Sequence, residues 1–377
     1  MQNVPFFIPD VDDTELNEIK SVLTNSEESK IEELEDRFSK YLPISNAIAT
    51  SSGTSALHLA MCSLDLKRGD KVICPVNAFP AIPEVVRHFD AEPIFVDIDI
   101  DDFNINLDAL ESLLSRNKSK KLKAIIVSHI AGQPTDLERL YKIGKAYNIK
   151  IVEDASQMLG GTYNDKNIGS AGGDMTVFSF SPHLSNSISN GGMLTTNNQD
   201  LAERSRLLRN HAIVTNGYDR HGNLDYVYDV VDIGCKYDIS ELNAAFSIAQ
   251  FSKLDKTIAR RAEIAEYYNK ELADVNHITT PVRKREHLYY LYIIKIDKNR
   301  DDFARKLKEK GVAVGLHYIP LHLLSYYKNK YELKVNDYPN ALKNYQQILS
   351  IPIYAKLSDT QAEYVVKTIK EIAKNRV

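Results

Sequence analysis

The chain has 377 residues and a mass of 42.7 kDa, which is long for a single hydrophobic core and predicts two domains. With 43% hydrophobic and 26% charged residues, its composition is that of a globular protein and excludes bulk disorder and fibrous folds. The formal net charge is −4 and there is no long basic run, so neither nucleic acid nor an anionic membrane is expected as the main partner.

The three cysteines, Cys62, Cys74 and Cys235, lack the paired spacing of a metal site, and no metal is predicted. We expect them to be small buried apolar groups in a reducing compartment. The N-terminal segment MQNVPFFIPDVDDTE lacks the basic and apolar parts of a signal peptide. No apolar run reaches the roughly 20 residues of a membrane helix. The sequence therefore predicts a cytoplasmic protein without a membrane partner.

Short apolar runs alternate with helical segments from residue 45 onward. The predicted strands are 71–76, 93–98, 123–130, 149–155 and 175–180. Predicted helices lie between most of them, at 81–89, 106–116 and 136–147, and Asn106 and Asp136 are suited to cap two of these helices. Strands without polar alternation, separated by helices, indicate a mainly parallel sheet that is covered on both faces. Residues 1–245 are therefore predicted to form one large α/β domain.

Residues 246–377 are predicted to form a connector helix and a smaller α+β domain. A long helical stretch begins near Ser240 and leads out of the large domain. It is followed by a predicted strand at 288–296, a helix at 301–311, a strand-like segment at 312–319 and a terminal helix from Ser358.

Three segments place polar groups where strands end. Gly53 and Thr54 follow a strand and open a helix whose N–H groups suit a phosphate, although the same residues fit an ordinary helix cap. Asp154 ends the strand 149–155, at the edge where open α/β sheets bind ligands and where solvated loop carboxylates also occur. Ser179 begins a Ser- and Gly-rich loop that is compatible with a phosphate site or with a plain turn.

The order and spacing of the motifs are more specific than any one of them. SGTSALHLA, Asn77-Ala78-Phe79, HIAGQP, VEDASQ and FSFSP…GGM follow one another, and further motifs continue to LSIPIY at 349–354. The chain resembles, over nearly its whole length, the nucleotide-sugar aminotransferases of the fold-type-I pyridoxal-phosphate superfamily, the DegT/StrS family. This resemblance implies an aspartate aminotransferase-like large domain and a smaller C-terminal domain. It also implies pyridoxal 5'-phosphate, or its amine form pyridoxamine 5'-phosphate, as the cofactor.

The resemblance implies a role for several residues around that cofactor. Asp154 would face the pyridine nitrogen and keep it protonated, so that the ring acts as an electron sink. Gln157 would contact the ring hydroxyl, and Phe79 would stack on the ring. The phosphate would be held by Thr54, Ser55 and Ser179.

Other expected contacts come from a second subunit and from the C-terminal domain. Lys236 of a partner subunit would complete the phosphate site, which implies a homodimer with shared active sites. His317 and His322 would lie near the active-site entrance and contact sugar or nucleotide, while a structural role in the small domain stays equally open for both.

Leu184 occupies the position of the family's reactive lysine, five residues after Ser179. Leucine has no amine, so it cannot form an imine or move a proton at the substrate carbon. The adjacent His183 is titratable but lies one position away. One explanation is a laboratory substitution or a wrongly rendered modified lysine. The others are a lysine-less sugar 3-dehydratase, although such enzymes carry histidine at this position, and a homologue that has lost catalysis.

The resemblance implies transamination as the reaction. An amino group would pass from an amino acid, typically glutamate, to the C3 or C4 carbonyl of a nucleotide-linked keto-sugar, and such products feed surface polysaccharides or protein glycans. The expected partners are this nucleotide-sugar, the amino-acid donor and a second copy of the chain. The alternatives are the 3-dehydratase on the same scaffold and a non-catalytic protein that binds nucleotide-sugars.

Overall fold

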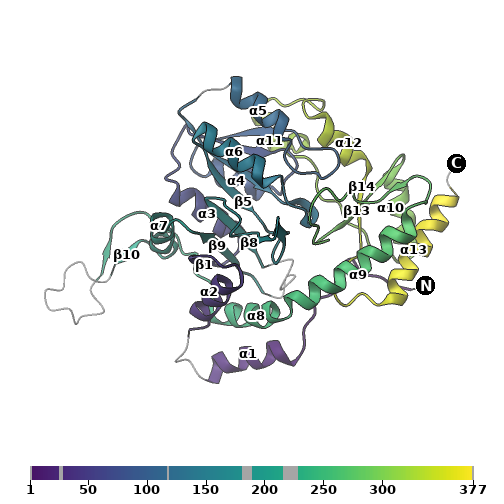
Figure 1. The fold of residues 1–377 in the computed structure, drawn as a ribbon, viewed down its shortest axis with the longest axis horizontal. Helices are drawn as coiled ribbons and strands as arrows, with labels where there is room; N and C mark the ends of the chain where they lie inside the picture. Colours follow the sequence, from purple (N-terminus) through teal and green to yellow (C-terminus); the bar gives the residue numbers. More distant parts are fainter. Residues whose placement is uncertain (1, 25–28, 117–118, 181–188, 215–227, 376–377) are drawn as a thin grey trace.

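The larger lobe is built on a seven-stranded sheet with the strand order β1-β9-β8-β5-β4-β2-β3 (Figure 1). This fold comes from a computed structural model that describes residues 2–24, 29–116, 119–180, 189–214 and 228–375. The strands are β1 (Asn46–Thr50), β2 (Lys71–Pro75), β3 (Glu92–Val96), β4 (Leu122–Ser128), β5 (Lys150–Asp154), β8 (Met175–Ser179) and β9 (Gly192–Thr196). Only the pairs that β9 makes in this sheet, with β1 and β8, are antiparallel. The predicted, mainly parallel sheet is confirmed.

Helices cover both faces of this sheet and give a three-layer α/β/α arrangement. One face carries α3 (Gly53–Ser63), α4 (Ala81–Arg87) and α7 (Gln199–Arg209), which share a core with Val72 and Ile126. The other face carries α2 (Lys30–Tyr41), α5 (Leu107–Arg116), α6 (Leu137–Tyr147) and α8 (Glu241–Ser252), which pack around Ile73 and Ile125. Successive strand residues point to opposite faces, so both faces of a covered strand must be apolar. This explains the uninterrupted apolar runs in the sequence.

Helices of the larger lobe begin where the sequence supplies capping side chains. Oδ1 of Asp136 accepts the N–H of Arg139 at 3.2 Å, and Oδ1 of Asn106 accepts the N–H of Ala109 at 2.9 Å. Such contacts satisfy N–H groups that the first helical turn leaves unpaired. The predicted starts of these two helices are confirmed.

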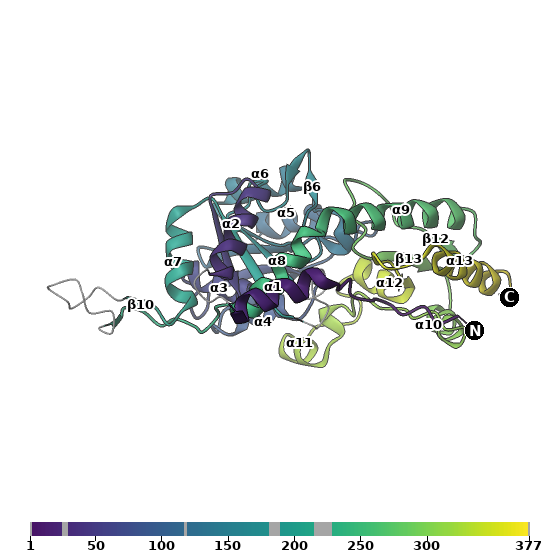
Figure 2. The same ribbon diagram turned by 90° about the horizontal axis from the view of Figure 1, so that it is seen from below.

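The smaller lobe has its own core and a three-stranded antiparallel sheet. Its strands are β12 (Ile278–Thr279), β13 (Tyr292–Ile296) and β14 (Ile348–Ile351), in that order. Helices α9 (Leu254–Leu272), α10 (Arg300–Glu309) and α13 (Asp359–Lys374) supply the rest of this core, which also contains the fully buried Val4. Both ends of the chain therefore lie beside α13 (Figures 1 and 2). The division of the chain at residue 245 stays a prediction.

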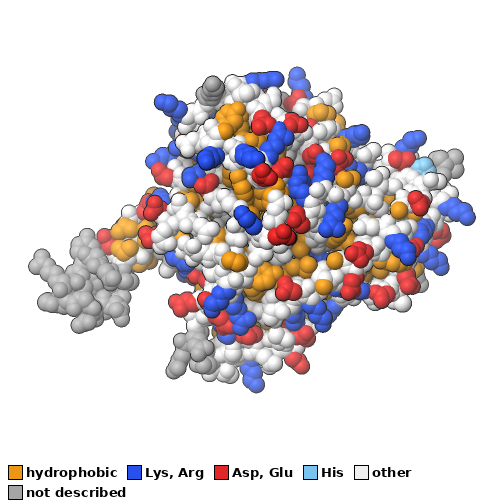
Figure 3. Space-filling view, in the orientation of Figure 1, with side chains coloured by type: hydrophobic (Ala, Val, Ile, Leu, Met, Phe, Trp, Pro, Cys, Tyr) orange, Lys and Arg blue, Asp and Glu red, His pale blue; other side chains and the backbone are white. Residues whose placement is uncertain are grey.

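Shorter elements connect and extend the two lobes. Helix α1 (Asp13–Thr24) lies below α8 in Figure 1, and the pair β10 (Ile213–Val214) and β11 (Asp229–Val230) projects beyond α7. The remaining elements are β6 (Thr162–Tyr163), β7 (Lys166–Asn167), α11 (Ser325–Lys330) and α12 (Pro339–Gln347). Within the described part of the chain, every helix is too short or too polar to cross a bilayer. Lysine and arginine side chains are interspersed with acidic ones over the face seen in Figure 3.

Two predictions for the second half of the chain are wrong. The long helical stretch from Ser240 is two helices, because α8 ends at Ser252 and α9 begins at Leu254. The segment 312–319 is not a strand, since Val312 and Gly315 make only isolated bridges, to Val4 and Ser350 respectively. Val312 is buried beside the N-terminal segment, but the rest of 312–319 is only partly buried or exposed and forms no regular ladder.

Candidate active site

A cavity of about 470 Å³ lies at the carboxyl ends of the parallel strands, the edge where open α/β sheets bind ligands. Six of the residues predicted to contact cofactor or substrate line it: Thr54, Phe79, Asp154, Gln157, Ser179 and His317. They come from segments that follow β1, β2, β5 and β8 and from the segment after α10. The fold thus brings together residues that are up to 263 positions apart in the sequence (317 − 54).

The N-terminus of α3 forms one wall of the cavity. Oγ of Ser52 accepts the N–H of Ser55 at 3.0 Å and so caps the helix. The N–H groups of Gly53 and Thr54 make no hydrogen bond to the described residues. These N–H groups and the positive end of the helix dipole favour an anion such as a phosphate. The Thr54 side chain is exposed to the cavity, and Ser179 adds a hydroxyl on the facing strand end.

Ser55 does not line the cavity, although it was predicted to bind phosphate. Its hydroxyl is hydrogen-bonded to those of Ser51 and Ser52, at 2.9 and 2.7 Å. Its side chain therefore supports the cap of α3 in this structure, and a direct contact with phosphate remains a prediction.

Two glycines allow α3 to start directly against the ends of β8 and β9. A Cβ atom on Gly53 would lie 2.5 Å from Cβ of Ser179, and one on Gly192 would lie 2.5 Å from the carbonyl carbon of Ser52. Both distances are far shorter than van der Waals contact. This close approach places the N-terminus of α3 and its N–H groups next to the hydroxyl of Ser179.

Asp154 lies at the end of β5 and faces the cavity. Its Oδ1 atom accepts the N–H of Ser156 at 3.1 Å. Burial raises the pKa of this carboxyl above its usual value, and the hydrogen bonds from Ser156 oppose that rise. No lysine or arginine lies among the described residues that line the cavity. The carboxylate is thus suited to pair with a positive charge on a ligand.

Gln157, Tyr318 and Phe79 form another part of the wall. Oε1 of Gln157 accepts the N–H of Ala131 at 2.7 Å, and Nε2 donates to Oη of Tyr318 at 2.7 Å. The ring of Tyr318 lies edge-on to that of Phe79, with centroids 6.0 Å apart. Phe79 is 56% exposed, so one face of its ring remains open for stacking.

His129 lines the cavity and was missed in the sequence analysis, which used it only as part of a motif. Its Nδ1 atom accepts the N–H of Thr135 at 3.3 Å, which assigns the ring proton to Nε2. Nε2 then donates to Oε2 of Glu153 at 3.0 Å, and Oε1 of Glu153 accepts the hydroxyl of Tyr141 at 2.6 Å. The signal was available, because His129 is the second-last residue of the predicted strand 123–130, at the same sheet edge as Asp154.

The two predicted substrate histidines lie in different surroundings. His317 lines the cavity, its Nδ1 atom lies 2.9 Å from Oγ of Ser350, and burial lowers its pKa to about 4. Its ring is therefore neutral at pH 7. His322 lies outside the cavity, is fully buried, and donates from Nε2 to the carbonyl of Val335 at 3.1 Å. In this structure only His317 is placed to meet a ligand in the cavity.

The remaining predicted residues do not line the cavity of this chain. Lys236 is largely exposed and forms an ion pair with Asp238 at 2.8 Å, so its predicted role in a partner's site stays a prediction. His183 and Leu184 lie in 181–188, outside the described residues. Ser179 and Asn190, on either side of that segment, both line the cavity.

Comparisons with known proteins give a consistent result. The model of the DegT/DnrJ/EryC1/StrS aminotransferase family matches residues 9–370. An uncharacterized protein of Methanocaldococcus jannaschii, MJ1066, is 34% identical over an alignment of 380 residues that covers 98% of this chain and 97% of that protein.

Solved structures are similar over almost the full length of the chain. The PLP form of Spr1654, a candidate sugar aminotransferase of Streptococcus pneumoniae, has a TM-score of 0.88 and 28% identity over 99% of both chains. Its PMP form has a TM-score of 0.90 and 27% identity over 99% of both chains. A DegT DnrJ EryC1 StrS aminotransferase from Brucella abortus has a TM-score of 0.85 and 28% identity, over 96% of this chain and 95% of that one. The expected fold-type-I architecture is confirmed.

Proposed function

Because the chain belongs to the DegT/DnrJ/EryC1/StrS aminotransferase family, we propose that it transfers an amino group from an amino acid to a nucleotide-linked keto-sugar, at C3 or C4. The cofactor of this family is pyridoxal phosphate, and similar structures have been solved in PLP and PMP forms. One observation carries the proposal: Asp154, Phe79 and the start of α3 meet around a single cavity.

The residues of the cavity fit this cofactor. The carboxyl of Asp154, whose pKa burial raises, is suited to hold a protonated ring nitrogen. The open face of Phe79 suits ring stacking, and the N–H groups of Gly53 and Thr54 suit the phosphate. When bound, the cofactor supplies an electron sink for the substrate carbon. Asp154 and Phe79 would then hold the ring, and the N–H groups at the start of α3 would hold its phosphate.

Leu184 favours a second candidate function. Its side chain can neither attach covalently to a carbonyl nor transfer a proton. A sugar 3-dehydratase that works without the lysine, on the same scaffold, is compatible with this residue. A homologue that binds nucleotide-sugars without catalysis is compatible as well.

The decisive experiment restores the amine. We expect Leu184→Lys to gain an absorbance band near the visible edge that borohydride abolishes, leaving a reduced adduct on the new lysine. Since a positioned acid–base group contributes about 10²–10⁴-fold, amino transfer from glutamate to a keto-sugar nucleotide should rise by roughly that factor. Leu184→Met is the matched control, because it changes the side chain without adding an amine. A lysine variant that binds the cofactor but gains neither adduct nor activity would count against transamination.

The wild-type chain separates the remaining candidates. Intact mass and tryptic mapping of the peptide around residue 184 first establish whether leucine is present in the purified protein. Cofactor held only as the amine, together with loss of water from the sugar at C3, supports the dehydratase. Failure to bind either cofactor form supports the non-catalytic homologue and contradicts the proposed transferase.

We also propose that the active unit is a homodimer. The segment around β10 and β11 stands out beyond α7 (Figures 1 and 2), and Figure 3 shows hydrophobic side chains along it. Its exposed apolar side chains are Ile213, Tyr228, Val230, Val231 and Ile233. An exposed apolar surface of this kind is typical of a protein interface. It leads directly into Lys236, the residue predicted to enter the partner's phosphate site.

A further inference from the structure

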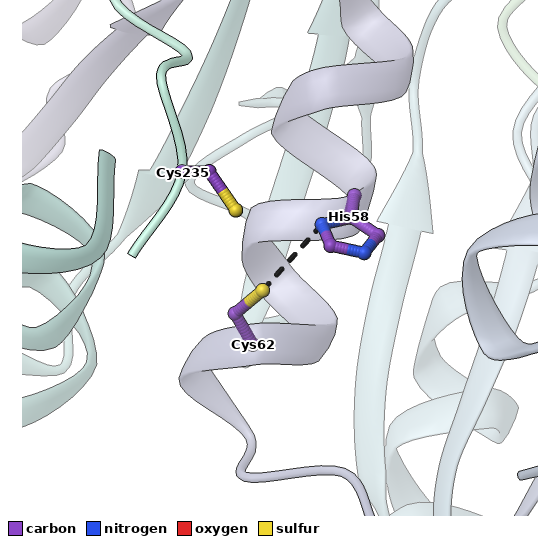
Figure 4. A group of neighbouring side chains, drawn as sticks. All are labelled: His58, Cys62 and Cys235. Carbon is purple, nitrogen blue, oxygen red and sulfur yellow. Dashed lines mark hydrogen bonds between the residues drawn. The ribbon is translucent and has the colours of Figure 1, made fainter. Parts of the chain in front are cut away.

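His58, Cys62 and Cys235 converge beside α3 (Figure 4). His58 and Cys62 lie one turn apart on α3, and Cys235 reaches them from the segment that precedes α8. The donor atoms of the three side chains all lie within 4.8 Å of one another. None of the three residues lines the cavity, so this cluster is separate from the candidate active site.

We propose that this cluster binds one zinc ion through Nδ1 of His58 and the thiolates of Cys62 and Cys235. Zn–S bonds of about 2.3 Å and Zn–N bonds of about 2.1 Å at a tetrahedral centre place sulfur and nitrogen about 3.6 Å apart. The observed distance from Sγ of Cys62 to Nδ1 of His58 is 3.5 Å. Positions i and i+4 of a helix face the same side, which is why these two donors meet.

The donor set selects the class of metal. Thiolate and imidazole ligands prefer zinc and other thiophilic ions, whereas magnesium and calcium prefer oxygen ligands. Binding converts two thiols into thiolates and releases two protons, so that one Zn²⁺ and two thiolates have no net charge. A neutral complex is suited to this half-buried location, where all three side chains are shielded in part from solvent.

The imidazole is held in an orientation that suits ligation. The ring of His58 stacks on Phe89, with centroids 5.0 Å apart and an interplanar angle of 21°. Its Nδ1 atom faces both Sγ of Cys62 and the hydroxyl of Tyr237, at 3.5 and 3.2 Å. Three protein ligands leave a fourth tetrahedral position for water or for the oxygen of Tyr237. A Cys62–Cys235 disulfide would not use the third donor, Nδ1 of His58, which lies at the separation expected of two ligands of one zinc ion.

The site would join two parts of the phosphate-binding region. The N–H of Ser51, just before α3, donates to the carbonyl of Tyr237 at 2.7 Å, and the N–H of Cys235 donates to the carbonyl of Leu208 at 2.7 Å. A zinc ion bound by both Cys62 and Cys235 would link α3 to the segment that carries Lys236 through two metal–sulfur bonds. Its role is therefore structural, and it stabilises the fold only when bound to the native state.

The experiment titrates Co²⁺ as a spectroscopic probe into the reduced, chelator-treated full chain and then displaces it with Zn²⁺. We expect one cobalt per chain, a thiolate-to-cobalt charge-transfer band in the near ultraviolet, and a higher melting temperature with zinc. Cys62→Ser, Cys235→Ser and His58→Gln should each weaken binding by more than the roughly 10- to 100-fold that loss of an outer-shell partner costs.

Two matched variants control for indirect effects. His88→Gln changes the histidine whose ring lies 5.2 Å from that of His58, and Cys74→Ala removes the fully buried cysteine of the sheet. Both should keep the cobalt band and the stoichiometry of the wild-type chain. The proposal is overturned if the reduced wild-type chain binds no cobalt, or if the two Cys→Ser variants bind it as the wild type does. The wild-type spectrum alone shows whether the chain binds cobalt, even if a variant fails to fold.

Discussion

The carboxyl group of Asp154 is expected to lower the stability of the cofactor-free fold and to raise the affinity for the cofactor. Burial raises its pKa above the ordinary value of 3.8, so its ionised form is less favourable in the folded chain than in the unfolded one. Such a group contributes fully to stability below its unfolded pKa, and the contribution is lost as the pH rises through the folded pKa. At pH 7, where an unfolded aspartate is ionised, burial of this carboxyl therefore costs the cofactor-free fold stability. In the proposed complex, a protonated ring nitrogen beside the carboxylate would offset this cost.

We therefore expect Asp154→Asn to stabilise the cofactor-free protein at pH 7 by about 1 kcal/mol, because a neutral amide replaces a poorly compensated charge. The gain should vanish near pH 3, where the aspartate is protonated. Cofactor affinity should fall by about 10- to 100-fold, since a charge-assisted hydrogen bond contributes about 1.5–3 kcal/mol. Urea unfolding at both pH values and absorbance titration with the cofactor measure the two effects.

Asp174→Asn provides the matched control. Asp174 forms an ion pair with Lys150 at 2.7 Å and accepts the N–H of Ile151 at 2.8 Å. Its loss should lower stability and leave cofactor affinity unchanged, because Asp174 does not line the cavity. If Asp154→Asn also lowered stability at pH 7, its carboxylate would have a compensating partner in the native protein.

Arg261 is a second residue whose charge is poorly compensated. It is 2% exposed, and its Nε and Nη1 atoms have no hydrogen-bond partner among the described residues. Burial lowers its pKa, and the ring of Tyr290, 5.6 Å from the guanidinium carbon, offsets part of the desolvation cost. The neighbouring Arg260 instead forms ion pairs with Glu263 and Asp359 at 3.0 and 2.6 Å.

We expect Arg261→Met to raise the free energy of unfolding by about 1–2 kcal/mol, because an apolar side chain of similar length removes an unpaired buried charge. Arg260→Met should lower it by less than about 1 kcal/mol, as for other partly exposed ion pairs. Urea unfolding of both variants measures the difference in sign. A loss of stability in Arg261→Met would indicate that a bound water or anion compensates the guanidinium.

At the level of single residues, the sequence predicted which residues meet at the cavity when their location follows from the end of a strand. Asp154 lies at the end of a predicted strand and Phe79 follows another, and the carboxyl ends of parallel strands share one edge. For His322 the sequence left a substrate contact and a structural role equally open, and only the tertiary fold shows that it is buried against Val335. The meeting of Cys62 with Cys235 could not be predicted either, because no local spacing relates them.

Among the secondary-structure elements, α3 links local sequence to the proposed phosphate site. Its first residue must be glycine, since a Cβ atom there would lie 2.5 Å from Cβ and 3.0 Å from Cα of Ser179. Relief of such a clash moves either α3 or the end of β8. Both movements would separate the helix N–H groups from the hydroxyl of Ser179.

We expect Gly53→Ala to destabilise the protein by about 1–3 kcal/mol, the usual cost of overpacking. It should also weaken binding of pyridoxal phosphate much more than binding of pyridoxal, which has no phosphate. Thr54→Ala is the control, because its exposed side chain should change stability by no more than about 0.5 kcal/mol. Equal losses for both ligands in Gly53→Ala would place the phosphate away from α3.

The elements themselves were predictable where their signals are local. Capping side chains such as Asp136 and Ser358 mark helix starts, and Ser358 forms a capping box with Gln361. The segment 312–319 has the apolar, β-branched composition of a strand, but it makes only isolated bridges, to Val4 and Ser350. Pairing with residues that distant is a property of the tertiary fold, so no pattern within the segment could exclude or establish it.

For the whole molecule, the proposed dimer decides whether the cavity is complete. In a single chain, the proposed phosphate site at the start of α3 has N–H groups and hydroxyls. No lysine or arginine is among the described residues that line the cavity. Lys236 lies outside the cavity, on an exposed segment next to the apolar residues of β10 and β11. A second copy of the chain would supply the missing positive charge if the two subunits exchange these segments.

Mixing two defective chains tests this arrangement. Asp154→Asn removes the proposed partner of the ring nitrogen, and Lys236→Ala removes the proposed phosphate ligand, so each variant alone should bind pyridoxal phosphate weakly. In an equal mixture of exchanged subunits, about half of the dimers are mixed and each has one intact site of two, so about one quarter of all sites should bind with wild-type affinity. Cofactor titration measures this fraction, and sedimentation confirms the dimer. If each site were built from one chain only, no site in the mixture would be intact, and the absence of a tight-binding fraction would refute the shared active site.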